Sequence, residues 1–156
     1  MPLVLNSSSI SGLAAVGGLS SPQTGSVLQV VTNTTTSQVS TSSTSFVSAT
    51  LAVSITPSST SSKVFVIVTS AAQGSTTNSL YFTIYRGATN LGGASLGMAL
   101  FSNGNGNEFP FSMSYLDSPS TTSSTTYTVY FRTNTGSVFF GENNMVTSIT
   151  AMEIAG

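Results

Sequence analysis

Residues 34–70 read TTTSQVSTSSTSFVSATLAVSITPSSTSSKVFVIVTS, and more than half of them are serine or threonine. Within this stretch apolar and polar side chains alternate, with the apolar set at Val47, Ala49, Leu51, Val53 and Ile55. Alternation with a period of two predicts a strand that is buried on one face only. Threonine suits such a strand because its branched Cβ packs well on a pleated surface. We therefore interpret the stretch as folded β structure and not as a disordered linker.

A turn and a second strand follow directly. TPSSTSS (56–62) contains a proline and a run of hydroxyl residues, which favour a turn. KVFVIVTSA (63–71) is apolar on both faces. Such a strand is either covered on both sides within the fold or packed at a subunit contact.

The rest of the chain repeats this pattern, with short apolar segments about ten residues apart and turn residues between them. No segment has a convincing helical period. The sequence predicts an all-β fold, an antiparallel β-sandwich or jelly roll of about 8–9 strands. The further predicted strands are 26–35, 79–87, 94–101 (the weakest), 109–117, 125–133, 135–144 and 145–154.

The first 24 residues differ from the rest. Residues 1–24 are rich in Gly, Ser and Ala, with short apolar clusters only around 3–5 and 13–16. We interpret them as an extended arm that lies along another protein, ahead of a sandwich domain at 25–156. A frayed terminus is the alternative that composition leaves open.

Charge is very scarce. Only 4% of the 156 residues are charged and the net charge is -1, so copies of the chain repel one another little. We expect an assembly. Three Lys and Arg side chains cannot neutralise a run of phosphates, which excludes nucleic acid as a partner. No apolar stretch approaches the ~18–20 residues that span a bilayer, so no membrane partner is expected.

The residues that usually carry catalysis or bind metals are missing. The chain has no His and no Cys, which excludes a Ser-His-Asp triad and thiolate or imidazole metal sites. Among the carboxylates, Glu108 and Asp117 flank a predicted strand and are expected roughly 25–30 Å apart, too far for a hydrolytic pair. NGNGNE (103–108) holds a single carboxylate, which favours a polar loop over a calcium site. We predict a protein that is not an enzyme and has no catalytic residues, no cofactor and no metal.

The other charged residues have structural interpretations. Arg86 and Arg132 each close a predicted strand and are expected to be solvated or salt-bridged. Lys63 begins a strand and is expected to protect its edge. Glu153 lies in the last strand, and the sequence leaves open whether it pairs with Arg86, pairs with Arg132 or faces solvent.

The tyrosines are the candidate binding residues. Tyr side chains can stack on sugars, but in strands they also pack a sandwich or an interface with the hydroxyl at the rim. A bound glycan would also contact the predicted loops 102–108 and 118–125. The candidates for glycan or interface contacts are Tyr81, Tyr85, Tyr115, Tyr127 and Tyr130.

Four blocks in this order resemble a small β-sandwich module of bacteriophage virion proteins, often tail-fibre-like. They are VLQVVTNTTTSQVSTSSTSFVSATLAVSITPSSTSSKVFVIV (27–68), FTIYRGATNLG (82–92), SYLDSPSTTSSTTYTVYFRTNTGSV (114–138) and SITAMEI (148–154). The opening LNSSSISGLAAVGGL (5–19) is similar to N-terminal segments of cyanophage structural proteins.

The resemblance implies a non-enzymatic, homotrimeric virion surface protein, assembled in the host cytoplasm. A fibre normally carries a shaft, and none is recognisable ahead of residue 25. Two structural interpretations therefore stay open: a short fibre for host attachment, or a capsid decoration (cement) protein, with residues 1–24 bound to other virion proteins. A third is an adhesin tip that binds a host surface glycan.

Overall fold

The computed structural model describes residues 22–75, 78–102 and 106–156. The predicted arm, residues 1–24, lies outside the described residues except for its last three. The described part of the chain forms strands and one short 3₁₀ helix, η1 (Glu142–Asn144). The strands are β1 (Val27–Thr35), β2 (Val39–Thr41), β3 (Val47–Ile55), β4 (Lys63–Gly74), β5 (Ser79–Arg86), β6 (Thr89–Asn90), β7 (Ala99–Ser102), β8 (Glu108–Asp117), β9 (Thr125–Thr133), β10 (Val138–Phe140) and β11 (Thr147–Ile154).

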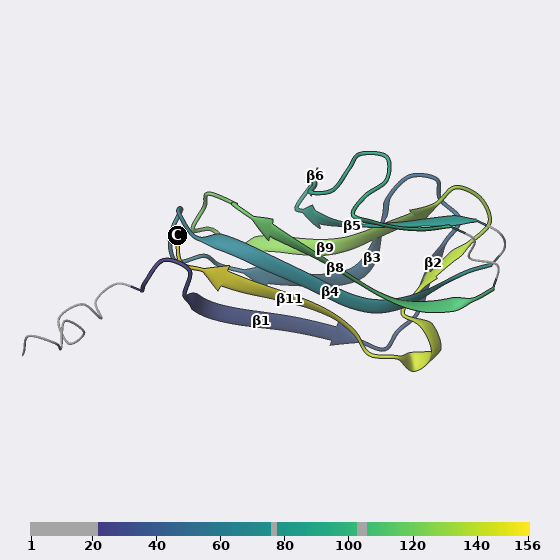
Figure 1. The fold of residues 1–156 in the computed structure, drawn as a ribbon, viewed down its shortest axis with the longest axis horizontal. Helices are drawn as coiled ribbons and strands as arrows, with labels where there is room; N and C mark the ends of the chain where they lie inside the picture. Colours follow the sequence, from purple (N-terminus) through teal and green to yellow (C-terminus); the bar gives the residue numbers. More distant parts are fainter. Residues whose placement is uncertain (1–21, 76–77, 103–105) are drawn as a thin grey trace, which may run out of the picture.

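The strands form two antiparallel sheets that pack face to face and run along the long axis of the molecule (Figure 1). In sheet A, β11 lies between β1 and β4, and β8 pairs with the other edge of β4. The short β10 continues the line of β11 along β4, and β2 pairs with β10. In sheet B the order is β3-β9-β5, with β6 and β7 on the outer edge of β5.

The order of pairing is nested. β5 pairs with β7, β4 with β8, β3 with β9 and β1 with β11, so each pair encloses the one before it. This is the topology of a jelly roll, a long antiparallel ribbon wrapped into two sheets. The predicted all-β sandwich is confirmed. The described residues contain eleven strands, more than the predicted number, because three of them are only two or three residues long.

The core lies between the sheets and is built from alternate residues of each strand. Of the inward set predicted for β3, Ala49, Leu51, Val53 and Ile55 are buried, and Val47 is half-buried against the core. Four phenylalanine rings pack at its centre, with Phe82 stacked on Phe111 at 4.3 Å between ring centroids. Phe140 contacts Phe82, Phe111 and Phe131 at about 6 Å. These contacts hold the two sheets together through burial of large apolar surfaces.

The strand β4 differs on its two faces. Val64, Val66 and Val68 are fully buried, whereas Phe65 and Ile67 on the other face are only half-buried. The described chain therefore covers one face of this strand and leaves its second apolar face accessible. The sequence left two interpretations of this strand open. The first, burial of both of its faces within the described fold, is wrong.

The prediction of a strand over 94–101 is largely wrong. The strand β7 begins at Ala99, and residues 93–97 form a tight loop closed by two hydrogen bonds between Gly93 and Gly97. Gly97 has φ +69°, a conformation that glycine adopts readily and that ends extended structure. The strand predicted over 135–144 is confined to 138–140 for a similar reason, because Gly141 has φ +78° and leads into η1.

Candidate functional site

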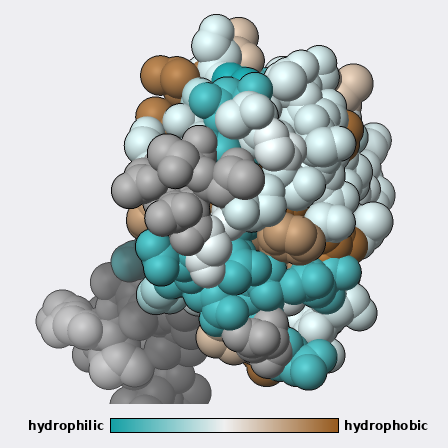
Figure 2. Space-filling view, turned by 90° about the vertical axis from the view of Figure 1, so that its right-hand side faces the viewer, coloured by the Kyte–Doolittle hydropathy of each residue, from teal (hydrophilic) through white to brown (hydrophobic). Residues whose placement is uncertain are grey.

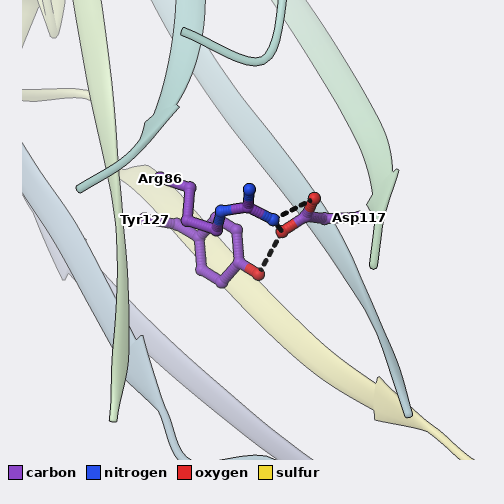
Figure 3. A network of polar contacts seen from close by, with 3 residues as sticks. All are labelled: Arg86, Asp117 and Tyr127. Carbon is purple, nitrogen blue, oxygen red and sulfur yellow. Dashed lines mark hydrogen bonds and ion pairs between the residues drawn. The ribbon is translucent and has the colours of Figure 1, made fainter. Parts of the chain in front are cut away.

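One polar cluster ties the two sheets together at the end of the sandwich where β8 stops (Figure 3). The Nη1 atom of Arg86, at the end of β5, donates to both oxygens of Asp117 at 2.8 and 2.9 Å. The hydroxyl of Tyr127, in β9, donates to the same carboxylate at 2.7 Å. Burial raises the pKa of the Tyr127 hydroxyl, and its bond to Asp117 raises that pKa further. Arg86 is thus a salt-bridged strand end, as predicted, and the cluster is a structural link between sheets A and B.

Glu153 is buried, and no Lys or Arg side chain of the described residues forms an ion pair with it. Its side chain is 1% exposed, and its carboxylate accepts a hydrogen bond of 2.6 Å from Gln29 Nε2. The backbone N–H and the hydroxyl of Ser58 donate to its other oxygen at 2.7 and 2.6 Å. Burial alone would raise the pKa of Glu153, but these hydrogen bonds outweigh it and lower the pKa to about 2. All three sequence alternatives for Glu153 are therefore wrong.

The carboxylates do not converge on a common space. Asp117 ends β8 as predicted, whereas Glu108, expected in the preceding loop, is the first residue of β8. Asp117 and Glu153 are each engaged in the clusters described above. In the ranges that the structure describes, no group of three or more Asp or Glu side chains is placed to hold a metal ion. No helix in those same ranges is long and apolar enough to cross a membrane.

The five candidate tyrosines are split between the core and two surfaces, one on each sheet. Tyr127 is fully buried, so neither a glycan nor a neighbouring chain can reach it, and its selection as a contact residue is wrong. Tyr115 is 37% exposed and lies on β8 in sheet A, away from the others. Tyr81, Tyr85 and Tyr130 share the outer face of sheet B, where the rings of Tyr85 and Tyr130 stack at 3.9 Å.

Beside these three tyrosines lies a groove, which we name the aromatic–arginine groove. It has a volume of about 460 Å³ and is lined by residues 44–46, residues 94–95, Tyr85 and Arg132. The guanidinium of Arg132 lies 3.7 Å from the ring centroid of Tyr81 and 5.3 Å from that of Phe46. Arg132 also donates to the backbone carbonyl oxygens of Thr44, at 3.3 Å, and Ser95. One side chain thus connects both walls of the groove to the sheet.

The wall at residues 94–95 belongs to a loop, residues 87–98, that folds over the outer face of sheet B. The loop stands out above β5 in Figure 1. It is held by a 2.6 Å hydrogen bond from Thr83 to Asn90 and by the 2.8 Å bond from the backbone N–H of Met98 to the carbonyl of Phe82. Two glycines allow this close approach, because a Cβ on Gly92 would lie 2.6 Å from Thr83 Oγ1 and one on Gly97 would clash with the Phe82 carbonyl oxygen.

Sequence reasoning found part of this groove. It selected Tyr81, Tyr85 and Tyr130, but it treated Arg132 as an ordinary strand end and missed Phe46. Of the loops it proposed, 118–125 follows β8 and does not line the groove, and residues 103–105 of the other lie outside the described residues. The signal that could have found Arg132 is its outward position beside Tyr130 on one strand, opposite a tyrosine on β5.

The outer face of sheet A has a different character. Val30, Met152, Phe65 and Leu116 lie opposite one another on β1, β11, β4 and β8, forming an apolar row across the whole sheet. Val30 is 56% exposed and Leu116 is 50% exposed, while the central pair is half-buried. Beyond this row the face carries hydroxyls, including a 2.9 Å hydrogen bond between Thr32 and Thr150.

The apolar surface at one end of the sandwich is arranged differently. Figure 2 looks onto the end where β5 begins and β9 stops, and hydrophobic patches there are separated by hydrophilic and neutral surface. The cross-strand alignment of the apolar row makes sheet A a better candidate for an extended contact than this end.

No family model matches the sequence, and no curated protein is significantly similar to it. Three solved structures from infectious bursal disease virus resemble the chain with TM-scores of 0.44, 0.39 and 0.38: the T13 viral particle, the Gt strain and the VP2 subviral particle. Their sequence identities are 17%, 15% and 17%, over 83%, 84% and 81% of this chain. The chain spans only 37%, 39% and 37% of the length of those proteins. Because these TM-scores are all below 0.5, the assignment of the fold rests on the strand order alone.

Proposed function

We propose that this chain is a non-enzymatic structural protein of a bacteriophage virion, which assembles with copies of itself through the outer face of sheet A. The observation that carries the proposal is the apolar row on a face whose centre is free of charge. The sequence blocks that resemble phage virion modules support the setting, and the jelly-roll topology is one that viral structural proteins use. Topology alone does not determine function, so the proposal rests on the outer face of sheet A.

The face is large enough for a specific contact between copies. The apolar row crosses four of the strands of sheet A, which lie about 4.8 Å apart, and the eight register pairs of β1 and β11 extend over about 26 Å. The flat area is therefore roughly 500 Å² per copy, or roughly 1,000 Å² for two copies, which is the lower size of a specific interface. Burying Phe65 and Leu116 there removes apolar surface from water, while the exposed Lys63 lies at the start of β4, at one end of the same face.

Three such faces can meet around a three-fold axis, and a homotrimer is the form we propose from the sequence resemblance. We further propose the short fibre as the role of the trimer, with residues 1–24 as the arm that attaches it to other virion proteins. A capsid decoration protein is the alternative. Counting the copies of this protein in imaged particles separates the two, since a few dozen indicate fibres and several hundred indicate a decorated shell.

The assembly itself is tested by sedimentation of the full chain. We expect the unaltered chain to sediment as a trimer and the double variant Val30→Lys, Leu116→Lys to sediment as a monomer, with association weakened at least about 100-fold. Both positions are half-exposed, so the variant is expected to keep its β-sheet circular dichroism. The matched control is Ser54→Lys, an exposed position on sheet B, which should remain trimeric. A monomeric unaltered chain, or a trimeric double variant, would refute this interface.

A second candidate function, an adhesin tip that binds a host glycan, is favoured by a separate observation. The aromatic–arginine groove combines stacked tyrosines, hydroxyls and a cation on sheet B, the sheet opposite the proposed interface. Both functions are therefore compatible in one molecule, because each uses its own face.

A further inference from the structure

We propose that the aromatic–arginine groove binds saccharides that carry a carboxylate group. This proposal rests on the glycan-binding function and narrows its ligand class. The groove volume of about 460 Å³ falls within the range of small-molecule sites. It is open to solvent along one side, which suits one or two residues of a longer chain better than an enclosed small ligand.

The charge in the groove selects the ligand class. The two arginines differ, since Arg86 is neutralised by Asp117, whereas Arg132 makes no ion pair with any carboxylate in the described ranges. The partners of Arg132 are two backbone carbonyls and two aromatic rings, which orient the guanidinium without cancelling its charge. A guanidinium has five N–H donors, so donors remain for a carboxylate, which it binds with planar, charge-assisted geometry.

The aromatic residues supply a platform for a sugar ring. Tyr85 is fixed by its stacking on Tyr130 and by an edge contact with Phe46 at 6.5 Å between centroids. A rigid, half-exposed ring offers apolar contact area at little cost in side-chain entropy. The exposed hydroxyls of Ser45 and Ser95 lie at the rim, where they can exchange hydrogen bonds with sugar hydroxyls.

The direct test compares two saccharides of the same length, one with free carboxylates and one with those carboxylates converted to methyl esters. Trigalacturonic acid and its methyl ester are titrated into the full chain and followed by calorimetry or by nuclear magnetic resonance shifts. We expect the acid to bind about ten-fold more tightly than the ester, and the ratio to shrink at about 0.5 M NaCl as the charge is screened. A glutamate hexapeptide tests whether any carboxylate polymer suffices, and we expect it to bind more weakly than the acid.

Three variants assign the contributions. Arg132→Met should remove the preference for the acid and leave binding of the ester within about two-fold, because the aromatic platform remains. Tyr85→Ala should weaken binding of the acid and of the ester alike. Lys63→Met removes one positive charge from sheet A, far from the groove, and should leave the ratio unchanged. This control separates a local contact from an effect of net charge.

The outcomes are distinct from those of the assembly proposal. Equal binding of acid and ester, stronger binding of the hexapeptide, or no binding of either saccharide overturns the inference, whatever the sedimentation result. The acid-to-ester ratio of the unaltered chain decides the matter even if a variant fails to fold. Loss of the trimer in Val30→Lys, Leu116→Lys with the ratio preserved would support the two surfaces as independent.

Discussion

The outer faces of the two sheets are formed by similar strands but differ in how much of each face other parts of the chain cover. Within the described ranges, the face of sheet A leaves an apolar row across four strands partly exposed, with Val30 and Leu116 at least half accessible. The face of sheet B is partly covered by residues 87–98, to the extent that Thr83 in its middle is fully buried. The only arginine without a carboxylate partner in the described ranges lies under that cover. A bare apolar face favours contact with another copy, whereas a covered face with a groove favours a smaller ligand.

The largest expected effect comes from breaking the cover on sheet B. Gly97→Ala places a Cβ against the carbonyl oxygen of Phe82 at a residue with φ +69°, so both crowding and backbone strain oppose it. We expect the free energy of unfolding to fall by about 3 kcal/mol, measured by urea denaturation. Gly87→Ala is the matched control, since its φ is +54° but nothing lies within 4 Å of the added Cβ. It should cost about 1 kcal/mol. Equal losses would mean that close packing of the loop contributes nothing.

The second prediction concerns the pH dependence of stability that the buried carboxylate of Glu153 produces. The pKa of Glu153 is lowered from 4.5 to about 2, so its ionised form stabilises the fold at every pH above about 4.5. That stability is lost as the pH falls from about 4.5 to about 2, and amounts to at most about 3 kcal/mol. Unfolding measured against pH should therefore be less steep over this range in Glu153→Gln.

Glu108→Gln removes an exposed carboxylate at the start of β8 and should leave most of the pH dependence in place. If Glu108→Gln flattened the profile as much as Glu153→Gln does, the buried hydrogen bonds of Glu153 would not be its source.

The smallest effect tests the link between the sheets. Tyr127→Phe removes the hydroxyl that donates to Asp117 and leaves the ion pair with Arg86 intact. We expect the free energy of unfolding to fall by about 1 kcal/mol, with no change in the groove, measured by denaturation and by ligand titration. Tyr130→Phe, on the outer face of the same strand, is the control and should change stability by less than about 0.5 kcal/mol. A larger loss in the control would move the stabilising role from the buried cluster to the outer face of sheet B.

Much of the fold could be predicted from the sequence, because a strand buried on one face shows its period directly. The bounds of β3, Val47–Ile55, and β9, Thr125–Thr133, match the predicted segments residue for residue. The strand β2 has only three residues, Val39–Thr41, which is too short for a period to appear. The packing of residues 87–98 on sheet B could not be predicted either, since it depends on close backbone contacts at Gly92 and Gly97 that no alternation encodes.

The candidate site was predicted less well because its residues meet only through long-range register. Tyr81 and Arg132 are brought opposite each other by the pairing of β5 with β9, and Phe46 joins them from the loop before β3. Glu153 shows the same limit. The sequence left its environment open, because its donors, Gln29 and Ser58, are 124 and 95 residues away in sequence.

The nested strand order has a consequence for how the molecule is made. β11 lies between β1 and β4, so sheet A cannot close until residues 147–154 have left the ribosome. Before then the facing edges of β1 and β4 are unpaired, and an unpaired edge readily joins the strand of another chain. We expect chains truncated before residue 147 to aggregate, so correct particles require complete synthesis to precede assembly.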